Sequence, residues 1–246
     1  MLSEVYDWLV PEQLLTPAGS VAAFAEAVGT LGAGARVLDC ASGTGRLAVG
    51  LALRGFQVVA CDASEGMVER TRSLAARHGA ALVARQCAWQ DLATQDWPEP
   101  FDAVFCVGNS LTHAAGQPGR RAALRAMAGV LRAGGLLVLT SRNWERVRAA
   151  GSGLQVADRL VERGGERSLV IHAWTLADDW DAAHFLDVAV ARLDNVGGVT
   201  TRGERLTFWP FRHEQLADDL HAAGLRQEST TYADDTDRYL VTARRP

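Results

Sequence analysis

Residues 36–50 constrain the fold most, because they run from a short apolar stretch through an acid and two glycines into a helical pattern. The acid is Asp39, the glycines are Gly43 and Gly45, and apolar residues recur after them at helical spacing. A strand, a glycine turn and a helix open the nucleotide site of a βαβ unit, since glycines let the backbone approach the ligand. The stretch therefore predicts an α/β fold with a ligand at this turn.

The charge of Asp39 narrows the ligand. A carboxylate at the mouth of the turn repels a pyrophosphate, whereas it attracts a ligand with an ammonium and a sulfonium, directly or through water. A capping or turn-fixing aspartate is the plain structural alternative. The spacing Asp-x-x-x-Gly-x-Gly resembles the binding loop of class I S-adenosylmethionine-dependent methyltransferases. This resemblance implies an α/β, Rossmann-like, seven-stranded sheet and S-adenosyl-L-methionine as cofactor.

Composition limits the other possibilities. A chain of 246 residues suits one α/β domain with an insertion. The sequence has no run of eighteen or more apolar residues, so no membrane span is expected. The N-terminus lacks the features of a signal peptide, so a cytoplasmic location is expected. A net charge of −4 without a basic tail argues against a nucleic-acid partner.

Lysine and cysteine usage excludes further chemistry. All 25 basic residues are arginine, which rules out a Schiff-base lysine or a phosphate-loop lysine. The four cysteines form no Cys-x-x-Cys pair, so we expect reduced, structural thiols and no metal site.

The pattern along the chain predicts one domain, 1–246, in four segments. These are an N-terminal arm and first helix (1–35), a cofactor-binding core (36–143), a substrate-covering antiparallel β meander inserted after strand 5 (144–210), and a closing helix with a β hairpin (211–246). The expected strands are 37–38, 56–60, 81–87, 101–107, 136–141, 154–164, 168–178, 182–194, 199–209, 225–232 and 237–244. Besides the helix that follows the glycine turn, the expected helices are 18–31, 64–78, 120–133 and 212–223.

Polar residues follow several of these strands. Asp62 ends the second strand, where an acid commonly accepts hydrogen bonds from a ribose diol. Trp89 follows the third strand and is expected to pack on an adenine, with an ordinary loop tryptophan as the alternative. Asn109 and His113 follow the fourth strand, at the edge where open α/β sheets bind ligands.

Four longer stretches resemble glycine and glycine/sarcosine N-methyltransferases. They begin at Val37, Asp62, Phe101 and Arg132, and together they cover about residues 36–145. The resemblance implies that the catalytic residues are Asn109, Arg142 and His113, with Arg142 taking a substrate carboxylate and His113 holding the loop or touching the cofactor. It implies that the cofactor-binding residues are Tyr6, Asp39, Ala41, Gly43, Gly45, Asp62, Ala63, Met67, Trp89 and Val107.

Two departures from that family bear on the substrate. A tyrosine of the meander is replaced by Val188, and another tyrosine position reads as Phe208 or Trp209. A pocket without these hydroxyls is expected to take a small-molecule amine larger than glycine.

The sequence disfavours two other functions that share this type of fold. An NAD-dependent dehydrogenase is disfavoured because the chain has no Tyr-x-x-x-Lys pair, and a nucleic-acid base methyltransferase because no Pro-Pro-aromatic stretch follows strand four. N-methylation of an amine or amino acid is the preferred function. An O-methyltransferase of a natural product and a non-catalytic cofactor-binding protein remain alternatives, and assembly into a homo-oligomer is left open.

Overall fold

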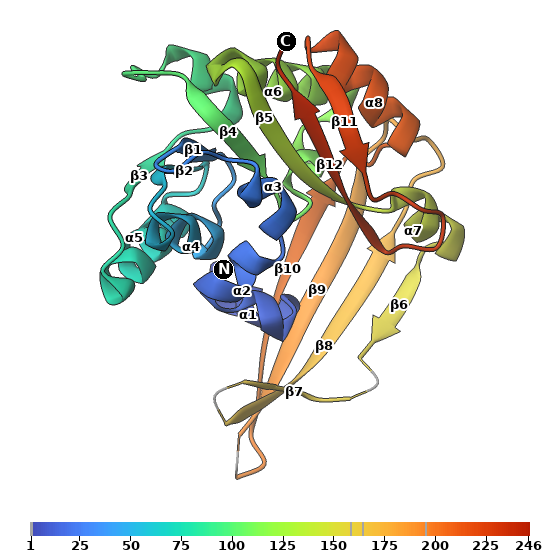
Figure 1. The fold of residues 1–246 in the computed structure, drawn as a ribbon. Helices are drawn as coiled ribbons and strands as arrows, with labels where there is room; N and C mark the ends of the chain where they lie inside the picture. The colour runs from blue at the N-terminus through green and yellow to red at the C-terminus, as the bar shows by residue number, and fades with distance from the viewer. Residues whose placement is uncertain (1, 158, 164, 195) are drawn as a thin grey trace.

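A computed structural model describes residues 2–157, 159–163, 165–194 and 196–246. Within these ranges the chain forms two β-sheets (Figure 1). The larger sheet has seven strands in the order β11 (Arg226–Thr230), β12 (Arg238–Arg244), β5 (Leu131–Arg142), β4 (Phe101–Cys106), β1 (Arg36–Asp39), β2 (Gln57–Asp62) and β3 (Val83–Gln86). The strands from β5 to β3 are mutually parallel, and β12 is antiparallel to both of its neighbours.

The strand order reverses between β1 and β4. From β1 the chain proceeds outward to β2 and β3, and it then returns to β4 on the other side of β1. The carboxyl ends of strands on either side of such a reversal form the usual ligand crevice of an open α/β sheet. This places Asp39 and the residues after Cys106 at the same edge.

Helices cover both faces of this sheet because alternate strand residues point to opposite sides. Val37 packs with α2 (Pro17–Ala22), α3 (Ala25–Gly29) and α4 (Arg46–Leu53), whereas Leu38 packs with α6 (Gly116–Val130) and α8 (His213–Ala222). The helix α5 (Glu65–His78) lies beside α4. Val37 and Leu38 are both fully buried, as expected of a central strand covered on its two faces.

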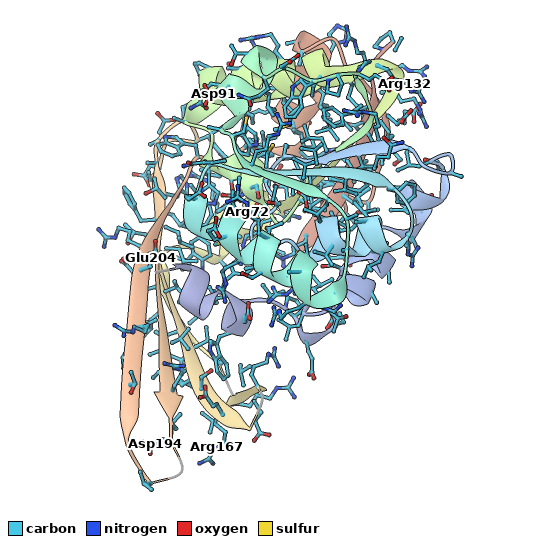
Figure 2. The ribbon with its side chains drawn as sticks, turned by 90° about the vertical axis from the view of Figure 1, so that its left-hand side faces the viewer. Arg72, Asp91, Arg132, Arg167, Asp194 and Glu204 are labelled. Carbon is cyan, nitrogen blue, oxygen red and sulfur yellow. The ribbon has the colours of Figure 1, made fainter. Side chains whose placement is uncertain are left out.

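The second sheet is an antiparallel insertion between β5 and α8. Its order is β10 (Val199–Phe208), β9 (His184–Leu193), β8 (Glu166–Thr175) and β6 (Gly153–Val156), and β7 (Val161–Arg163) also pairs with β8. Figure 2 shows these strands extending away from the larger sheet, with Arg167 and Asp194 at the far end and Glu204 nearer to it.

A tryptophan-rich cluster joins the second sheet to the rest of the chain. Trp8 of α1 (Leu2–Leu9) and Trp144 of α7 (Trp144–Ala150) are buried against even-numbered residues of β8, β9 and β10. Burial of large aromatic side chains is a strong driving force, so this cluster fixes the inner face of the insertion. The short 3-10 helices are η1 (Glu12–Leu14), η2 (Trp89–Thr94) and η3 (Ser110–His113).

The predicted fold class is confirmed: a seven-stranded sheet closes with a β hairpin, and an antiparallel insertion follows its fifth strand. No helix in the described part of the chain is long and apolar enough to cross a membrane. The predicted first helix is wrong in extent, because Phe24 leaves helical geometry and packs edge-on against Phe105, which separates α2 from α3.

Other boundaries also moved. The helix predicted to reach residue 133 ends at Val130, because Leu131 already pairs with Phe101 in the sheet. The strand predicted over 154–164 is two strands, β6 and β7, and its residues 158 and 164 lie outside the described residues. The helix α7 was not predicted; the Asn143 side chain caps it by accepting a hydrogen bond from the Arg146 N–H at 3.1 Å.

Candidate active site

The glycine turn after β1 requires its glycines. Gly43 and Gly45 have φ angles of 54° and 82°, a region that other residues adopt only with strain. A Cβ on Gly45 would lie 2.7 Å from the Thr71 hydroxyl, so α5 packs directly on the turn. A Cβ on Gly43 would meet no atom within 4 Å, which leaves the backbone there open to a ligand.

Asp62 is tied to the turn by hydrogen bonds. Its Oδ2 accepts the N–H of Gly43 and its Oδ1 accepts the N–H of Ser64, each at 2.9 Å. A carboxylate oxygen has two acceptor sites, so both oxygens keep one for another donor. The structure therefore joins two of the predicted cofactor residues and leaves the carboxylate able to accept hydroxyl groups.

Asp39 lies deeper than the sequence indicated. Its residue surface is 1 % exposed, and burial raises its pKa to about 7, with the charge of Asp62 adding to the shift. Backbone N–H groups of Ala41 and Ala48 bind the carboxylate and oppose the shift. Its Oδ1 and the Ser42 hydroxyl are buried and have no hydrogen-bond partner among the described residues.

The other predicted cofactor residues surround this turn. The indole N–H of Trp89 donates to the Cys40 carbonyl at 2.8 Å, which holds the ring against the end of β1. Met67 is buried on the first turn of α5, and Ala63 precedes that helix with its carbonyl bonded to Gln86. Val107 accepts a hydrogen bond from the Ser110 hydroxyl at 2.7 Å.

The N-terminal arm reaches the same edge. A Cβ on Gly108 would lie 3.8 Å from the Tyr6 hydroxyl, so Tyr6 sits over the end of β4. Burial raises the pKa of Tyr6, while the charges of Arg46 and Arg238 lower it. Arg46 also forms an ion pair with Asp7 at 2.5 Å, and this pair fastens α1 to the start of α4.

Asn109 links the ends of β4 and β5. It has a φ of 69°, the one non-glycine residue with a positive φ in the described chain, and it is 4 % exposed. Its Oδ1 accepts the backbone N–H of Arg142 at 2.9 Å, and its Nδ2 donates to the Thr112 hydroxyl at 3.0 Å. Strain at a buried polar residue is typical of functional sites, and here the side chain positions Arg142.

Arg142 presents a free cation. Its guanidinium lies 5.5 Å from the centroid of the Trp174 ring, and it makes no hydrogen bond or ion pair with a described residue. Burial lowers its pKa to about 10, with the nearby Arg238 contributing, so the group remains charged at neutral pH.

His113 lies at the end of η3, the short helix that follows β4. Its Nδ1 lies 3.0 Å from the Thr207 carbonyl, which can only accept, so Nδ1 carries the proton and Nε2 is an acceptor. Burial lowers its pKa, which keeps the ring neutral at pH 7. The ring lies 4.9 Å from Phe208, and Phe208 lies 6.0 Å from Trp174, so aromatic contacts run from His113 towards Arg142.

Comparison with known proteins explains this arrangement. A family model described as a methyltransferase domain matches residues 37–135. A glycine/sarcosine N-methyltransferase of Aphanothece halophytica is 30% identical over 206 residues, which cover 83% of this chain and 71% of that protein. The chain belongs to the class I S-adenosylmethionine-dependent methyltransferases.

Two further similarities agree with this family. A glycine/sarcosine N-methyltransferase of Parasynechococcus marenigrum is 40% identical over 123 residues, but that match covers only 50% of this chain and 43% of the relative. The amino pentose methyltransferase CalS10 of Micromonospora echinaspora, solved with S-adenosylmethionine bound, has a TM-score of 0.72 at 22% identity. That match covers 99% of this chain and 95% of CalS10, and it supports the methyltransferase fold.

The residues present fit the cofactor of this family. S-adenosylmethionine combines an ammonium, a sulfonium and a ribose diol. The site offers the unpartnered Asp39 Oδ1 and Ser42 hydroxyl, the two oxygens of Asp62 and the open backbone at Gly43. This acidic, glycine-lined edge suits a cationic nucleoside better than a pyrophosphate.

Sequence reasoning missed three residues of this methyltransferase site. Arg46 begins α4 directly after the glycine turn, and its position there was a readable signal. Trp174 and Arg238 lie far along the chain, and only strand register brings them beside Arg142. Register in the insertion was not readable from its uneven alternation.

Proposed function

We propose that this methyltransferase transfers a methyl group from S-adenosylmethionine to the nitrogen of a small amine that carries an anionic group. The observation that carries the proposal is Arg142, whose half-buried, charged guanidinium has no hydrogen-bond or ion-pair partner in the described part of the chain. Asn109 holds Arg142 beside the edge of the larger sheet where the parallel strands have their carboxyl ends, here called the cofactor edge. A planar guanidinium pairs with a carboxylate through two parallel hydrogen bonds, so it can fix the direction of an attached amine.

The relatives support an amine acceptor. The two relatives described above are both named glycine/sarcosine N-methyltransferases. By the resemblance to that family, Val188 and either Phe208 or Trp209 stand at tyrosine positions. Val188 and Phe208 are buried in the apolar inner face of the second sheet. An acceptor with more apolar surface than glycine fits this difference.

Each part of the chain has a role in the proposal. Residues 36–143 hold the cofactor, with Asp62 accepting the ribose hydroxyls and Trp89 packing on the adenine. Residues 144–210 cover the acceptor, and the arm within residues 1–35 brings Tyr6 over the cofactor edge. Hydroxyl donors to a carboxylate make hydrogen bonds of the stronger, charge-assisted kind.

The reaction needs alignment more than acid–base strength. The bound cofactor supplies an electrophilic methyl group on a sulfonium. Arg142 orients the acceptor, and the neutral His113 offers Nε2 to an amine N–H, which keeps the nitrogen lone pair directed at the methyl group. Positioning of two reactants in line is worth roughly 7–11 kcal/mol of the barrier. The aromatic inner face and the arm exclude water.

A panel of acceptors tests the proposal. The protein is incubated with S-adenosylmethionine and, separately, with amino acids, amines without an anionic group, and phenols or alcohols, and products are read by mass spectrometry. A gain of one methyl group on the nitrogen of an anionic amine is expected. Methylation confined to phenols or alcohols would instead establish an O-methyltransferase.

A further inference from the structure

Arg142 and Arg238 lie directly opposite each other on neighbouring strands. They are Cα partners in the antiparallel pair β5–β12. Residues opposite each other in such a pair project from the same face of the sheet, with Cβ atoms about 4.5–5.5 Å apart. Arg142 contacts Trp174 of the second sheet, so both side chains lie on the face that the insertion and the arm cover.

Neither guanidinium is neutralised within the described residues. No ion pair or side-chain hydrogen bond joins either one to a described carboxylate, and the carboxylate of the adjacent Asp237 is paired with Arg146 at 3.0 Å. By contrast, the buried Arg120 binds Asp219 at 2.6 Å, and the half-buried Arg121 binds the same carboxylate at 2.6 Å. Like charges directly opposite in a sheet are destabilising, so this pair opposes folding until an anion joins it.

A histidine of the second sheet lies near Arg142. Burial lowers the pKa of His172 on β8, and the nearby positive charge of Arg142 lowers it further. Arg238 is an exposed residue, but desolvation of its guanidinium lowers its pKa, while the charges of Tyr6 and Asp237 oppose this. The two cations therefore stand between the cofactor edge and the inner face of the insertion.

We infer that Arg142 and Arg238 form a single site for a doubly negative group of the acceptor, so that the methylated amine carries either two carboxylates or a phosphoryl group. This inference rests on the proposed function and adds the substrate class to it. Two forked guanidiniums supply enough donors to pair with both carboxylates of a dicarboxylate, or with three oxygens of a phosphoryl group. A single carboxylate uses only one of them.

Calorimetry tests the site without any methyl transfer. The protein is saturated with S-adenosylhomocysteine at pH 8, and malonate, inorganic phosphate and acetate are titrated in turn. At least one of the two dianions is expected to bind ~10-fold or more tightly than acetate, a difference of about 1.4 kcal/mol. Preference for malonate identifies a dicarboxylate acceptor, and preference for phosphate identifies a phosphorylated one.

Variants assign the effect to the pair. Arg238→Gln and Arg142→Gln are each expected to abolish the preference for the dianion, with S-adenosylhomocysteine affinity unchanged. Arg226→Gln is the matched control, since Arg226 lies on the adjacent strand β11 with a side chain 75% exposed. Retained S-adenosylhomocysteine binding shows that each variant is folded.

Three outcomes would overturn the inference. These are equal affinity for acetate and both dianions, no binding of either dianion, and an Arg238→Gln variant that weakens S-adenosylhomocysteine while dianion affinity is kept. The last would assign Arg238 to the carboxylate of the cofactor. In each case the proposed function stands or falls separately, on methylation of monoanionic amines in the acceptor panel.

Discussion

The side-chain Oδ1 of Asn109 lies 2.9 Å from the backbone nitrogen of Arg142 and accepts its hydrogen. This bond joins the ends of two adjacent parallel strands, β4 and β5, on the side where the cofactor edge meets the insertion. Asn109 thereby positions the residue to which the proposed function assigns the acceptor, at the expense of a left-handed backbone.

Asn109→Gly should separate these two features. Glycine adopts the positive φ without strain but lacks the acceptor oxygen, whereas Asn109→Asp keeps an acceptor oxygen at the same position. We expect kcat/KM for the acceptor to fall by roughly 10-fold in Asn109→Gly, from the loss of one hydrogen bond of about 1.5 kcal/mol, and less in Asn109→Asp. Steady-state kinetics measure this, and an Asn109→Gly enzyme as active as wild type would contradict it.

Asp62→Ala should weaken cofactor binding. The variant loses the acceptor for the ribose hydroxyls and the bond to the Gly43 N–H that shapes the turn. A loss of ~1.5–3 kcal/mol corresponds to a roughly 10- to 100-fold rise in the dissociation constant of S-adenosylhomocysteine. The exposed Asp96→Ala is the control for calorimetry. An unchanged constant in folded Asp62→Ala would place the ribose elsewhere.

Asp39 predicts a pH dependence of stability. Its folded pKa of about 7 lies above the ordinary value near 3.9, so between these values the folded state binds more proton than the unfolded state. Its contribution to the free energy of unfolding therefore falls as pH rises from about 4 to about 7, and is constant above.

Asp39→Asn removes this titration. Relative to wild type, the free energy of unfolding of the variant should increase between pH 5 and pH 8. The increase should be on the order of 1.4 kcal/mol for each pH unit crossed below the folded pKa of Asp39. Urea unfolding at the two pH values measures it. A stability difference that is the same at both would show that Asp39 does not carry the raised pKa.

The ion pair between Asp7 and Arg46 should slow cofactor release. Asp7→Asn breaks the contact that fastens α1 to α4, while the Arg46 side chain is only 12% exposed. Pairs of this kind contribute up to about 1 kcal/mol, so the dissociation rate of S-adenosylhomocysteine should rise by roughly 2- to 5-fold in stopped-flow experiments. Glu12→Gln, which removes the looser pair with Arg163 at 3.8 Å, should leave the rate unchanged. An Asp7→Asn rate equal to wild type would separate the arm from cofactor exchange.

The parts of the fold that depend on local sequence could be predicted. Gly43 and Gly45 predict the turn because few other residues adopt their positive φ angles. Asp62 could be placed because it ends an apolar stretch that is typical of a strand. The closing hairpin was also readable, since two β-rich runs flank a short polar turn at 233–236.

Features that depend on tertiary context could not be predicted from the sequence. The burial of Asp39 depends on the position of β1 between β2 and β4. The placement of Arg238 opposite Arg142 depends on the register of two strands almost one hundred residues apart in the sequence. Asn109 was predicted to contact substrate, and that prediction remains. Its bond to Arg142 adds a positioning role that no sequence pattern indicated.

The most direct test of the proposed function compares Arg142→Lys with wild type on an anionic amine from the acceptor panel and on the neutral amide of the same compound. Lysine keeps the charge but loses the forked pairing, so kcat/KM for the anionic amine should fall roughly 10- to 100-fold, with cofactor affinity unchanged and little effect on the amide. An Arg142→Lys enzyme with unaltered kcat/KM on the anionic amine would contradict the account and favour an O-methyltransferase.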